Sequence, residues 1–384
     1  MNCTTRSRLL PAAACTAAVL ILTSPLAAQR SAADGVQQSY ADMMGAELYD
    51  ASCANCHGAT GAGVPQTTLG FDTPPADFTD CSFASREPDG DWVGVAHEGG
   101  PLRGFFHMMP AFGDALTEEQ LQSVIDYVRT LCGDDSWPRG DLNMPRPMVT
   151  EKAYPEDELV WTMETAVEGA GTALGEITYE KRFGRRGQFE LVVPFGLRQQ
   201  SGAGGDGWAS GLGDVVLGWK HVLTHSYRRG SILSAAAELK LATGDAGRGF
   251  GAGTSVAEAF VSYGQLLPAD AFVQLQGVVE VPFDQDVAGN EAALRVAVGK
   301  TFTRGRWGRA WSPMVEVLAA RELESGATIH WDLVPQFQVT LNQRQHVMAN
   351  LAVRVPVNDT VGRHPRVLLY VLWDWFDGGL LDGW

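Results

Sequence analysis

The second half of the chain carries one dominant pattern, a regular alternation of apolar and polar residues that starts near Leu159. In one run, Phe189, Leu191 and Val193 recur with period two, which places them on one side of a β-strand. About twelve such runs follow one another between Gly-rich or charged turns. They begin near Leu159, Leu174, Gln188, Asp214, Ser231, Ser255, Ala271, Glu291, Trp311, Thr328, His346 and Arg366. The pattern predicts an all-β antiparallel unit over residues 158–384.

The length of these runs is typical of a transmembrane barrel, whose strands need about 9–11 residues to cross a bilayer. Alternation alone leaves a soluble β-sandwich or a lipocalin-like barrel open, because both also bury one apolar face. The longer, Gly-rich connections 199–213 and 244–254 fall at one end of the expected barrel. Short turns fall at the other end, at residues 184–187, 225–229, 267–269, 304–308 and 342–344. Because outer-membrane barrels have short periplasmic turns, we expect such a barrel with about twelve strands.

The N-terminus has the parts of a secretory signal peptide. A basic start at Arg6 and Arg8 precedes an apolar run, rich in Ala and Leu, over residues 9–26. Small residues then offer a cleavage site before Gln29. An uncleaved anchor is the alternative. We predict a signal peptide over residues 1–28, so the mature chain would work outside the cytoplasm.

A chemical signal follows, where Cys53-Ala54-Asn55-Cys56-His57 reads C-x-x-C-H. This is the attachment motif of a c-type haem. Cys53 and Cys56 would form thioether bonds with the haem vinyl groups, and His57 would be the proximal iron ligand. A redox-active C-x-x-C is expected near a βαβ pattern, and a structural zinc site needs a second ligand pair; the sequence has neither. We therefore predict one covalently attached haem c and a redox function.

The segment 107–113, His-Met-Met-Pro-Ala-Phe-Gly, closely resembles class I monohaem cytochromes c. In that family a Met-Pro pair precedes an aromatic residue and a C-terminal helix, and the Met directly before the Pro ligates the iron. The resemblance implies Met109 as the second axial ligand, and ligation by Met and His raises the reduction potential. Met108, His107 and His97 are the competing ligands.

The same resemblance implies an all-α domain over residues 29–136. Thr117-Glu118-Glu119-Gln120 reads as a capping box at the start of the last helix. Apolar residues at helical spacing then share one face, namely Leu121, Val124, Ile125, Val128 and Leu131. A first helix is expected around residues 40–52, where Gly45 and Tyr49 match the family positions that pack against the last helix.

Two cysteines remain outside the haem motif and the signal peptide. Cys3 and Cys15 leave with the signal peptide, so Cys81 and Cys132 are left in an oxidising compartment. Two such cysteines most simply form a disulfide, with two separate thiols as the alternative. The bond would tie a loop of the haem domain to the end of its last helix.

Residues 137–157 join the two units. The first part, 137–147, is rich in proline and has neither a helical nor a strand period. We interpret it as an ordered, extended linker, with specific binding by this segment as the less favoured alternative.

The chain is acidic, with a formal net charge of −16. Most of this excess lies before residue 150, in the expected haem domain. Nucleic acid is therefore excluded as a partner. A basic periplasmic redox partner would be steered to this domain, although the acidity would also simply keep a periplasmic domain soluble.

In arrangement, the chain resembles cytochrome–porin fusions. We expect an electron carrier rather than an enzyme, because iron ligated by His57 and Met109 has both axial positions filled. A labile Met109 would instead allow oxidase- or peroxidase-like activity. The alternative function is an outer-membrane channel for small solutes with an accessory haem domain, since the barrel is also similar to channel proteins of aromatic-degradation pathways. The haem domain would face the periplasm, and the barrel would contact outer-membrane lipid.

Overall fold

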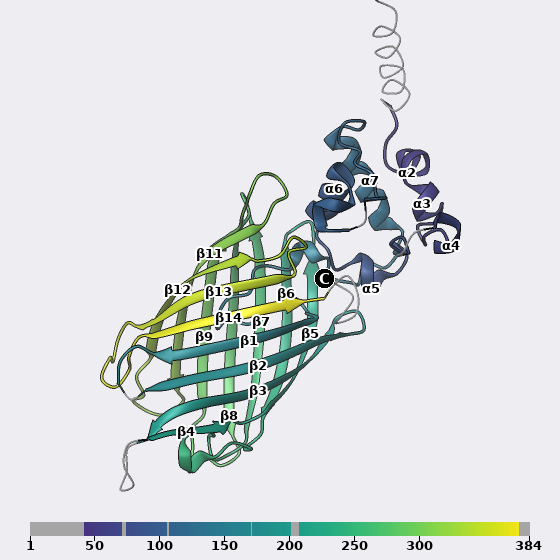
Figure 1. Ribbon diagram of the computed structural model, residues 1–384. Coiled ribbons are helices and arrows are strands. Elements are labelled where there is room, and N and C mark those ends of the chain that lie inside the picture. Colours follow the sequence, from purple (N-terminus) through teal and green to yellow (C-terminus); the bar gives the residue numbers. More distant parts are fainter. Residues whose placement is uncertain (1–41, 71–73, 106, 170, 201–206, 376–384) are drawn as a thin grey trace, which may run out of the picture.

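The computed structural model describes residues 42–375, except for 71–73, 106, 170 and 201–206. The expected signal peptide lies outside the described residues. A helical unit lies against one end of a β-barrel (Figure 1), so the chain has the two structural units that the sequence predicts.

The helical unit is built from mostly short helices. Their bounds are α2 Ala46–Ser52, α3 Ala54–His57, α4 Gln66–Leu69, α5 Cys81–Ala84, α6 Asp89–Glu98, η1 Gly100–Arg103, α7 Glu118–Thr130 and η2 Gly140–Leu142. None of the described helices combines the length and the hydropathy that a bilayer crossing requires.

Helix α7 confirms the predicted last helix. The Thr117 hydroxyl accepts a hydrogen bond from Gln120 N at 3.3 Å, and Gln120 Oε1 accepts one from Thr117 N at 3.0 Å, which is the predicted capping box. Apolar side chains of α7 pack against α2 in one core cluster that includes Leu48, Tyr49, Leu121, Val124 and Val128. Helix α2, the first helix among the described residues, begins at Ala46, whereas the expected helix starts near residue 40, outside the described residues.

The barrel is one antiparallel sheet that closes on itself. Its strands are β1 Glu158–Ala166, β2 Thr172–Phe183, β3 Gly187–Gln200, β4 Gly207–Leu212, β5 Val216–Ser226, β6 Ser231–Lys240, β7 Val256–Leu267, β8 Ala271–Pro282, β9 Glu291–Lys300, β10 Phe302–Thr303, β11 Ala310–Glu322, β12 His330–Thr340, β13 Val347–Pro356 and β14 Arg366–Asp374. Pairing of β1 with β14 closes the ring, in which β4 and β10 are short additions beside twelve main strands. Each main strand begins within two residues of its predicted start.

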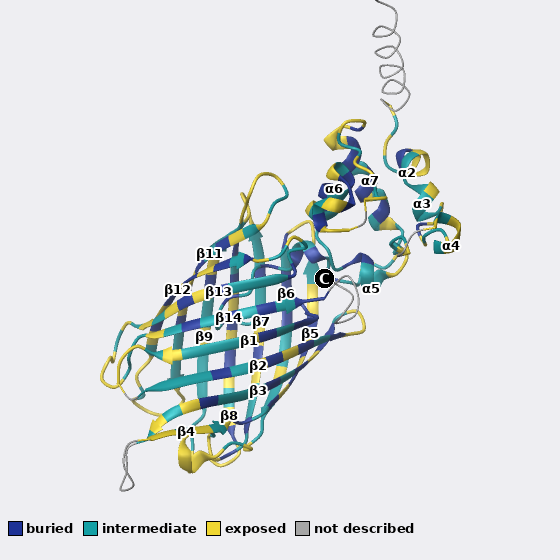
Figure 2. Ribbon diagram, viewed as in Figure 1, coloured by how far each residue is buried: buried dark blue, intermediate teal, exposed yellow. Residues whose placement is uncertain are grey.

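The polarity of the two strand faces distinguishes a membrane barrel from a soluble one. Outward side chains such as Trp161, Phe189 and Trp219 are apolar and exposed, whereas inward ones such as Gln274 and Asn350 are polar and buried. Figure 2 shows exposed and buried residues alternating along the strands. A soluble β-fold places its apolar face inside, so this reversed distribution is that of a barrel surrounded by lipid.

The segment expected to be a linker passes through the interior of the barrel. Its side chains Leu142 and Tyr154 pack with Val222 and Ile232 of β5 and β6. Others reach the opposite side of the ring: Met144 packs with Phe272 and Met314, and Met148 with Leu318 and Leu368. We call residues 142–157 the lumen segment. It fills the barrel interior in addition to joining the two units.

The predicted short turns lie at the end of the barrel that carries the helical unit. Arg185 in the turn after β2 pairs with Asp134, and Gln343 in the turn after β12 donates hydrogen bonds to the carbonyls of Pro101 and Leu102. The connection after β5 and the connection before β11 make similar contacts. The helical unit therefore sits on the short-turn side of the barrel.

Candidate haem site and its attachment to the barrel

The C-x-x-C-H motif forms a single helical turn. Cys53 is the C-cap of α2 and the N-cap of α3, and His57 N donates to Cys53 O at 2.9 Å. The Tyr49 hydroxyl donates to the carbonyl of Gly58 at 2.7 Å, which ties the end of this turn to α2. The turn brings Cys53, Cys56 and His57 together, as the motif predicts, and both thiols are free and half-buried.

The chemistry of Cys53 differs from that of a redox-active cysteine. Burial raises the pKa of the Cys53 thiol to about 11, and the neighbouring Cys56 raises it further. A disulfide oxidoreductase needs a cysteine with a lowered pKa, because the thiolate is its nucleophile. The environment of Cys53 therefore does not suit a redox-active C-x-x-C motif.

His57 is held in a form that can bind a metal. Its ring stacks on Phe78 with 4.7 Å between centroids. Burial lowers the pKa of the imidazole, so the ring is neutral at neutral pH. Its Nδ1 is buried, and the backbone of Ala76 counteracts part of the lowering of the pKa. A neutral imidazole and two free thiols on one turn fit a covalently attached haem.

The candidates for the second axial ligand lie between η1 and α7 or in α6. Met109 is half-buried and its carbonyl accepts a hydrogen bond from Gly100 N at 3.0 Å, whereas Met108 is 44% exposed. The His97 ring lies 4.6 Å from the ring of Trp307, in the barrel turn before β11. His107 is exposed. Met109 stays the predicted ligand, because its burial suits that role better than the exposure of Met108.

Cys81 and Cys132 are joined by a disulfide, with 5.0 Å between their Cα atoms. The bond connects the start of α5 to the residues just after α7 and closes a loop with a sequence separation of 51. It thereby holds the segment that supplies Phe78, the ring stacked on His57, close to the last helix.

Asp89, at the start of α6, joins the helical unit to the barrel. Its carboxylate pairs with Arg129 of α7 at 2.7 Å and with Arg139, just before the lumen segment. It also accepts a hydrogen bond from the Tyr227 hydroxyl, in the turn after β5, at 3.2 Å. Burial alone would raise the pKa of Asp89, but Arg129 and Arg139 lower it below its usual value. The nearby Asp141 has a raised pKa, caused by burial and then by Asp89.

A second attachment surrounds Trp307. Arg103 donates from Nη1 to the Trp307 carbonyl at 2.6 Å. Gly94 lies directly under the indole, since a Cβ at Gly94 would come within 2.9 Å of Trp307 Cδ1. Arg344 stacks over Phe105 at 4.7 Å. The helical unit is therefore held by several turns of the barrel as well as by the chain connection.

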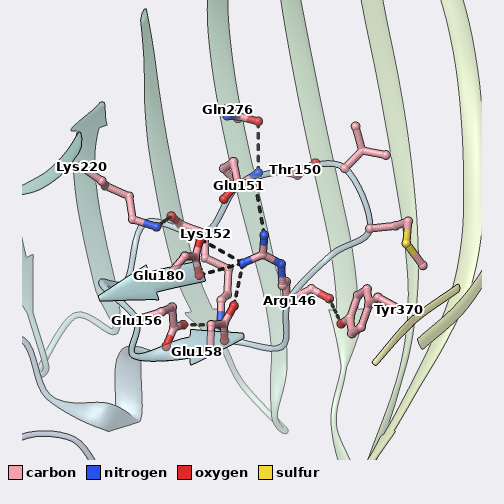
Figure 3. Close-up of polar contacts among 12 residues, drawn as sticks. Arg146, Thr150, Glu151, Lys152, Glu156, Glu158, Glu180, Lys220, Gln276 and Tyr370 are labelled. Carbon is pink, nitrogen blue, oxygen red and sulfur yellow. Dashed lines mark hydrogen bonds and ion pairs between the residues drawn. The ribbon is translucent and has the colours of Figure 1, made fainter. Parts of the chain in front are cut away.

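The lumen segment is bound by side chains of the barrel interior. Glu316, which is 0% exposed, accepts hydrogen bonds from Met148 N at 2.8 Å, Thr150 N at 2.7 Å and Thr150 Oγ1 at 2.6 Å. On the other side of the ring, Arg146 pairs with Glu158 at 2.6 Å and with Glu180 at 3.0 Å (Figure 3). These contacts make the segment an integral part of the barrel interior.

Sequence reasoning missed these interior residues. The sequence offers only weak indications of them. Two basic residues, Arg146 and Lys152, lie in the expected linker, and several strands carry inward carboxylates, but no sequence pattern shows that these groups pair with one another. Lys152 pairs with Glu156, and its carbonyl accepts a hydrogen bond from Lys220 at 3.1 Å (Figure 3). Only the closed ring brings these groups together.

Comparison with known proteins gives one family and several similar folds. The cytochrome c family model matches residues 43–132. The search of curated proteins found no significant match. Among solved structures, the KdgM porin shares 10% identity with a TM-score of 0.38, over 56% of this chain and 98% of that chain. An outer membrane channel from Pseudomonas putida F1 shares 15% identity with a TM-score of 0.42, over 60% and 99% of the two chains.

The NanC porin is similar at 6% identity with a TM-score of 0.40, over 56% of this chain and 98% of that chain. The barrel is defined by its own strand pairing. The helical unit, in contrast, carries both the family match and the C-x-x-C-H turn within the matched residues. The chain is therefore a fusion of a cytochrome c domain, at residues 43–132, with a closed antiparallel β-barrel of twelve main strands.

Proposed function

We propose that this protein is an outer-membrane c-type cytochrome that carries single electrons. One haem would be attached through Cys53 and Cys56 and ligated by His57 and Met109. The observation that carries the proposal is the helical turn with two free thiols and a neutral, half-buried imidazole, inside a domain that matches the cytochrome c family. The barrel's apolar exterior supports the membrane location.

Each residue of the haem site would have a separate role in electron transfer. The haem would supply a one-electron iron couple. Cys53 and Cys56 would anchor it, and Phe78 would hold the plane of the His57 ring by stacking. Met109 would close the second axial position, which disfavours oxidase or peroxidase chemistry. The haem domain would face the periplasm, because it sits on the short-turn end of the barrel.

The barrel would serve mainly as an anchor. The alternative of a permanently open solute channel is not favoured, because the lumen segment fills the interior and contacts opposite sides of the ring. The net charge of −16 supports a basic redox partner, since opposite charges accelerate encounter at low salt.

The first test is haem staining of an outer-membrane fraction on a gel, with and without boiling. We expect a haem-positive band that changes mobility on heating, which would show covalent haem and a folded barrel in one chain. A haem-positive band found only in the soluble periplasmic fraction would contradict the membrane location, and a heat-modifiable band without haem would contradict the cytochrome.

The preference for a basic redox partner is tested with small redox mediators of opposite charge. The purified protein in detergent should be reduced faster by a cationic metal complex than by an anionic one of similar driving force. The preference should shrink as salt is added, because screening weakens attraction to the acidic domain. Equal rates at low salt would remove the basis for a basic partner but leave the electron carrier intact.

A further inference from the structure

Inward-facing carboxylates form a continuous row across neighbouring strands of the barrel. The register pairs Glu158 of β1 with Glu180 of β2, and Glu180 with Glu190 of β3. Farther round the ring it pairs Glu238 of β6 with Glu258 of β7, and Glu258 with Glu280 of β8. We call Glu158, Glu180, Glu190, Glu238, Glu258 and Glu280 the carboxylate row.

The two halves of the row meet over a glycine. Gly218 of β5 is the register partner of both Glu190 and Glu238. A Cβ at Gly218 would lie 3.2 Å from Glu190 Cβ and 3.1 Å from Glu238 Cγ. The side chains of Glu190 and Glu238 therefore lie beside the space that a side chain at Gly218 would occupy, and the row continues across β5.

The row runs from one end of the barrel to the other. Register partners lie side by side across the strands, and barrel strands are tilted by about 35–45° from the barrel axis, so a register line climbs along the axis. Glu158 is the first residue of β1, at the end that carries the cytochrome domain. Glu280 lies near the end of β8 and pairs with Glu291, the first residue of β9, at the far end.

At the cytochrome end, the chain's own cations occupy this row. The Arg146 guanidinium of the lumen segment lies against Glu158 and Glu180 (Figure 3), and Lys152 Nζ lies 3.8 Å from Glu158. Farther along, Lys240 lies 3.8 Å from Glu280. The structure thus shows that Glu158, Glu180 and Glu280 of the row bind cationic groups, and that the lumen segment brings two of these groups.

The lumen segment is held by side chains and is not a strand of the sheet. Its backbone is bound by Glu316, by Gln274, which donates to the Pro145 carbonyl at 2.8 Å, and by Tyr370, which donates to the Arg146 carbonyl at 2.6 Å. Water can replace such hydrogen bonds one by one, unlike the ladder of a closed sheet. The Tyr154 hydroxyl, 3.4 Å from the Ser85 carbonyl, connects the segment to the cytochrome domain.

Space exists on the cytochrome side of the segment. A cavity of about 320 Å³ lies between the two units, lined by Asp91 and Arg103 of the cytochrome domain, by Arg146 of the lumen segment and by Gln338 of β12. Residues of the lumen segment therefore border this cavity.

We propose that the lumen segment is a gate, and that its release opens a path for small inorganic cations along the carboxylate row. This activity goes beyond electron transfer, because it assigns a transport route to the barrel. Closure follows from the segment's contacts with opposite sides of the ring, and the selectivity for cations follows from the sign of the row.

The test measures conductance of the full-length, haem-loaded protein in planar lipid bilayers. The wild type should be nearly silent. A release variant, Glu316→Ala with Arg146→Ala, loses charged hydrogen-bond partners on opposite sides of the segment. Its open probability should rise about tenfold or more, since each such hydrogen bond stabilises the closed state by at least that factor. In a KCl gradient, its reversal potential should have the sign for cation preference.

Two further variants separate gating from selectivity. Asp332→Asn removes another buried inward carboxylate, which pairs with Arg354 and Arg363 and not with the lumen segment, so it should stay as silent as the wild type. Glu238→Gln with Glu258→Gln, added to the release variant, should keep conductance but reduce the cation preference. If the release variant fails to fold, Glu316→Gln alone keeps the side-chain shape and takes its place.

Heat-modifiability on gels and the haem spectrum confirm that each variant is folded. Folded release variants that stay silent would overturn the gate, as would a wild type that conducts equally. Anion preference in the open variant would overturn the cation path. The haem spectrum and mediator reduction should be unchanged throughout, so failure of this proposal and failure of the electron-carrier proposal give different results.

Discussion

At the scale of single residues, the haem motif works through the environment of its side chains. The half-buried His57 is neutral because loss of solvent lowers its pKa, and its ring is oriented by stacking on Phe78. Before haem is attached, the Cys53 thiol keeps its proton because burial raises its pKa. Local chemistry distinguishes the two candidate methionine ligands less clearly, since Met108 and Met109 are adjacent and differ mainly in exposure.

Met109→Leu, which keeps the size of the side chain and removes the sulfur, should convert the ferric haem to a high-spin form. The Met-to-iron absorption band should disappear, and the reduction potential should fall because Met ligation raises it. The matched variant Met108→Leu should leave spectrum and potential unchanged. A spectral change in Met108→Leu alone would assign the ligand to Met108.

Asp89 should make the cytochrome domain sensitive to acid. Its folded-state pKa is lowered, so it stabilises the fold above the unfolded pKa, near 3.9, and this stabilisation is lost as the pH falls below about 4. Asp141, whose pKa is raised, acts in the opposite sense over a higher pH range. Arg129, Arg139 and Tyr227 are the other charged or titratable groups that contact Asp89.

Asp89→Asn should lower the stability of the cytochrome domain at neutral pH by about 3–5 kcal/mol, because two arginines lose a buried partner. The variant should also lose less of its free energy of unfolding than the wild type as the pH falls below about 4. Thermal unfolding followed by haem absorbance in detergent measures both effects. Asp126→Asn, at an exposed position on α7, is the control; an equal effect there would show that the effect is not specific to the Asp89 site.

At the scale of elements, helices and strands here follow different local signals. Helix α7 begins where its capping box is, and its apolar face packs against α2. The strands follow period two, and their starts could be predicted within two residues because each main strand must present one face to lipid and the other to the interior. The lumen segment has neither signal, so its path could not be predicted.

Thr117→Ala should destabilise the cytochrome domain by about 1 kcal/mol, since the N-terminal turn of α7 loses its side-chain acceptor. Thr117→Ser keeps the hydroxyl and should be close to wild type. Unfolding of the haem domain by denaturant measures the difference. A serine variant that loses as much stability as the alanine variant would show that the threonine methyl group, rather than the cap, is responsible.

At the scale of the whole molecule, the cytochrome domain and the start of the lumen segment are packed closely at Gly140. Gly140, which precedes the lumen segment, donates from its N to the Ser85 carbonyl at 2.7 Å. A Cβ at Gly140 would lie 1.8 Å from the carbonyl oxygen of Arg86, which is backbone and cannot turn aside. The joint therefore depends on the absence of a side chain at this position.

Gly140→Ala should separate the cytochrome domain from the barrel while leaving the haem attached. Limited proteolysis should then release a haem-stained fragment of the size of the cytochrome domain at least about tenfold faster, given an overpacking cost of about 1–3 kcal/mol. Gly90→Ala in α6, where the space is open, should leave proteolysis unchanged. Release at the wild-type rate from a folded Gly140→Ala protein would contradict this account of the joint.

The sequence by itself determined the features with a local signal: the haem motif, the capping box, the twelve strand starts and the separation of short turns from long loops. These are set by spacings within a few residues, which chain geometry converts directly into a helix turn or a strand face. Only the tertiary structure decided the path of residues 142–157 and the attachment of the two units. Their contacts join residues far apart in the chain, as from Met148 to Glu316 and from Arg103 to Trp307, separations of 168 and 204. Such partners become neighbours only when the ring closes, so no local pattern can specify them.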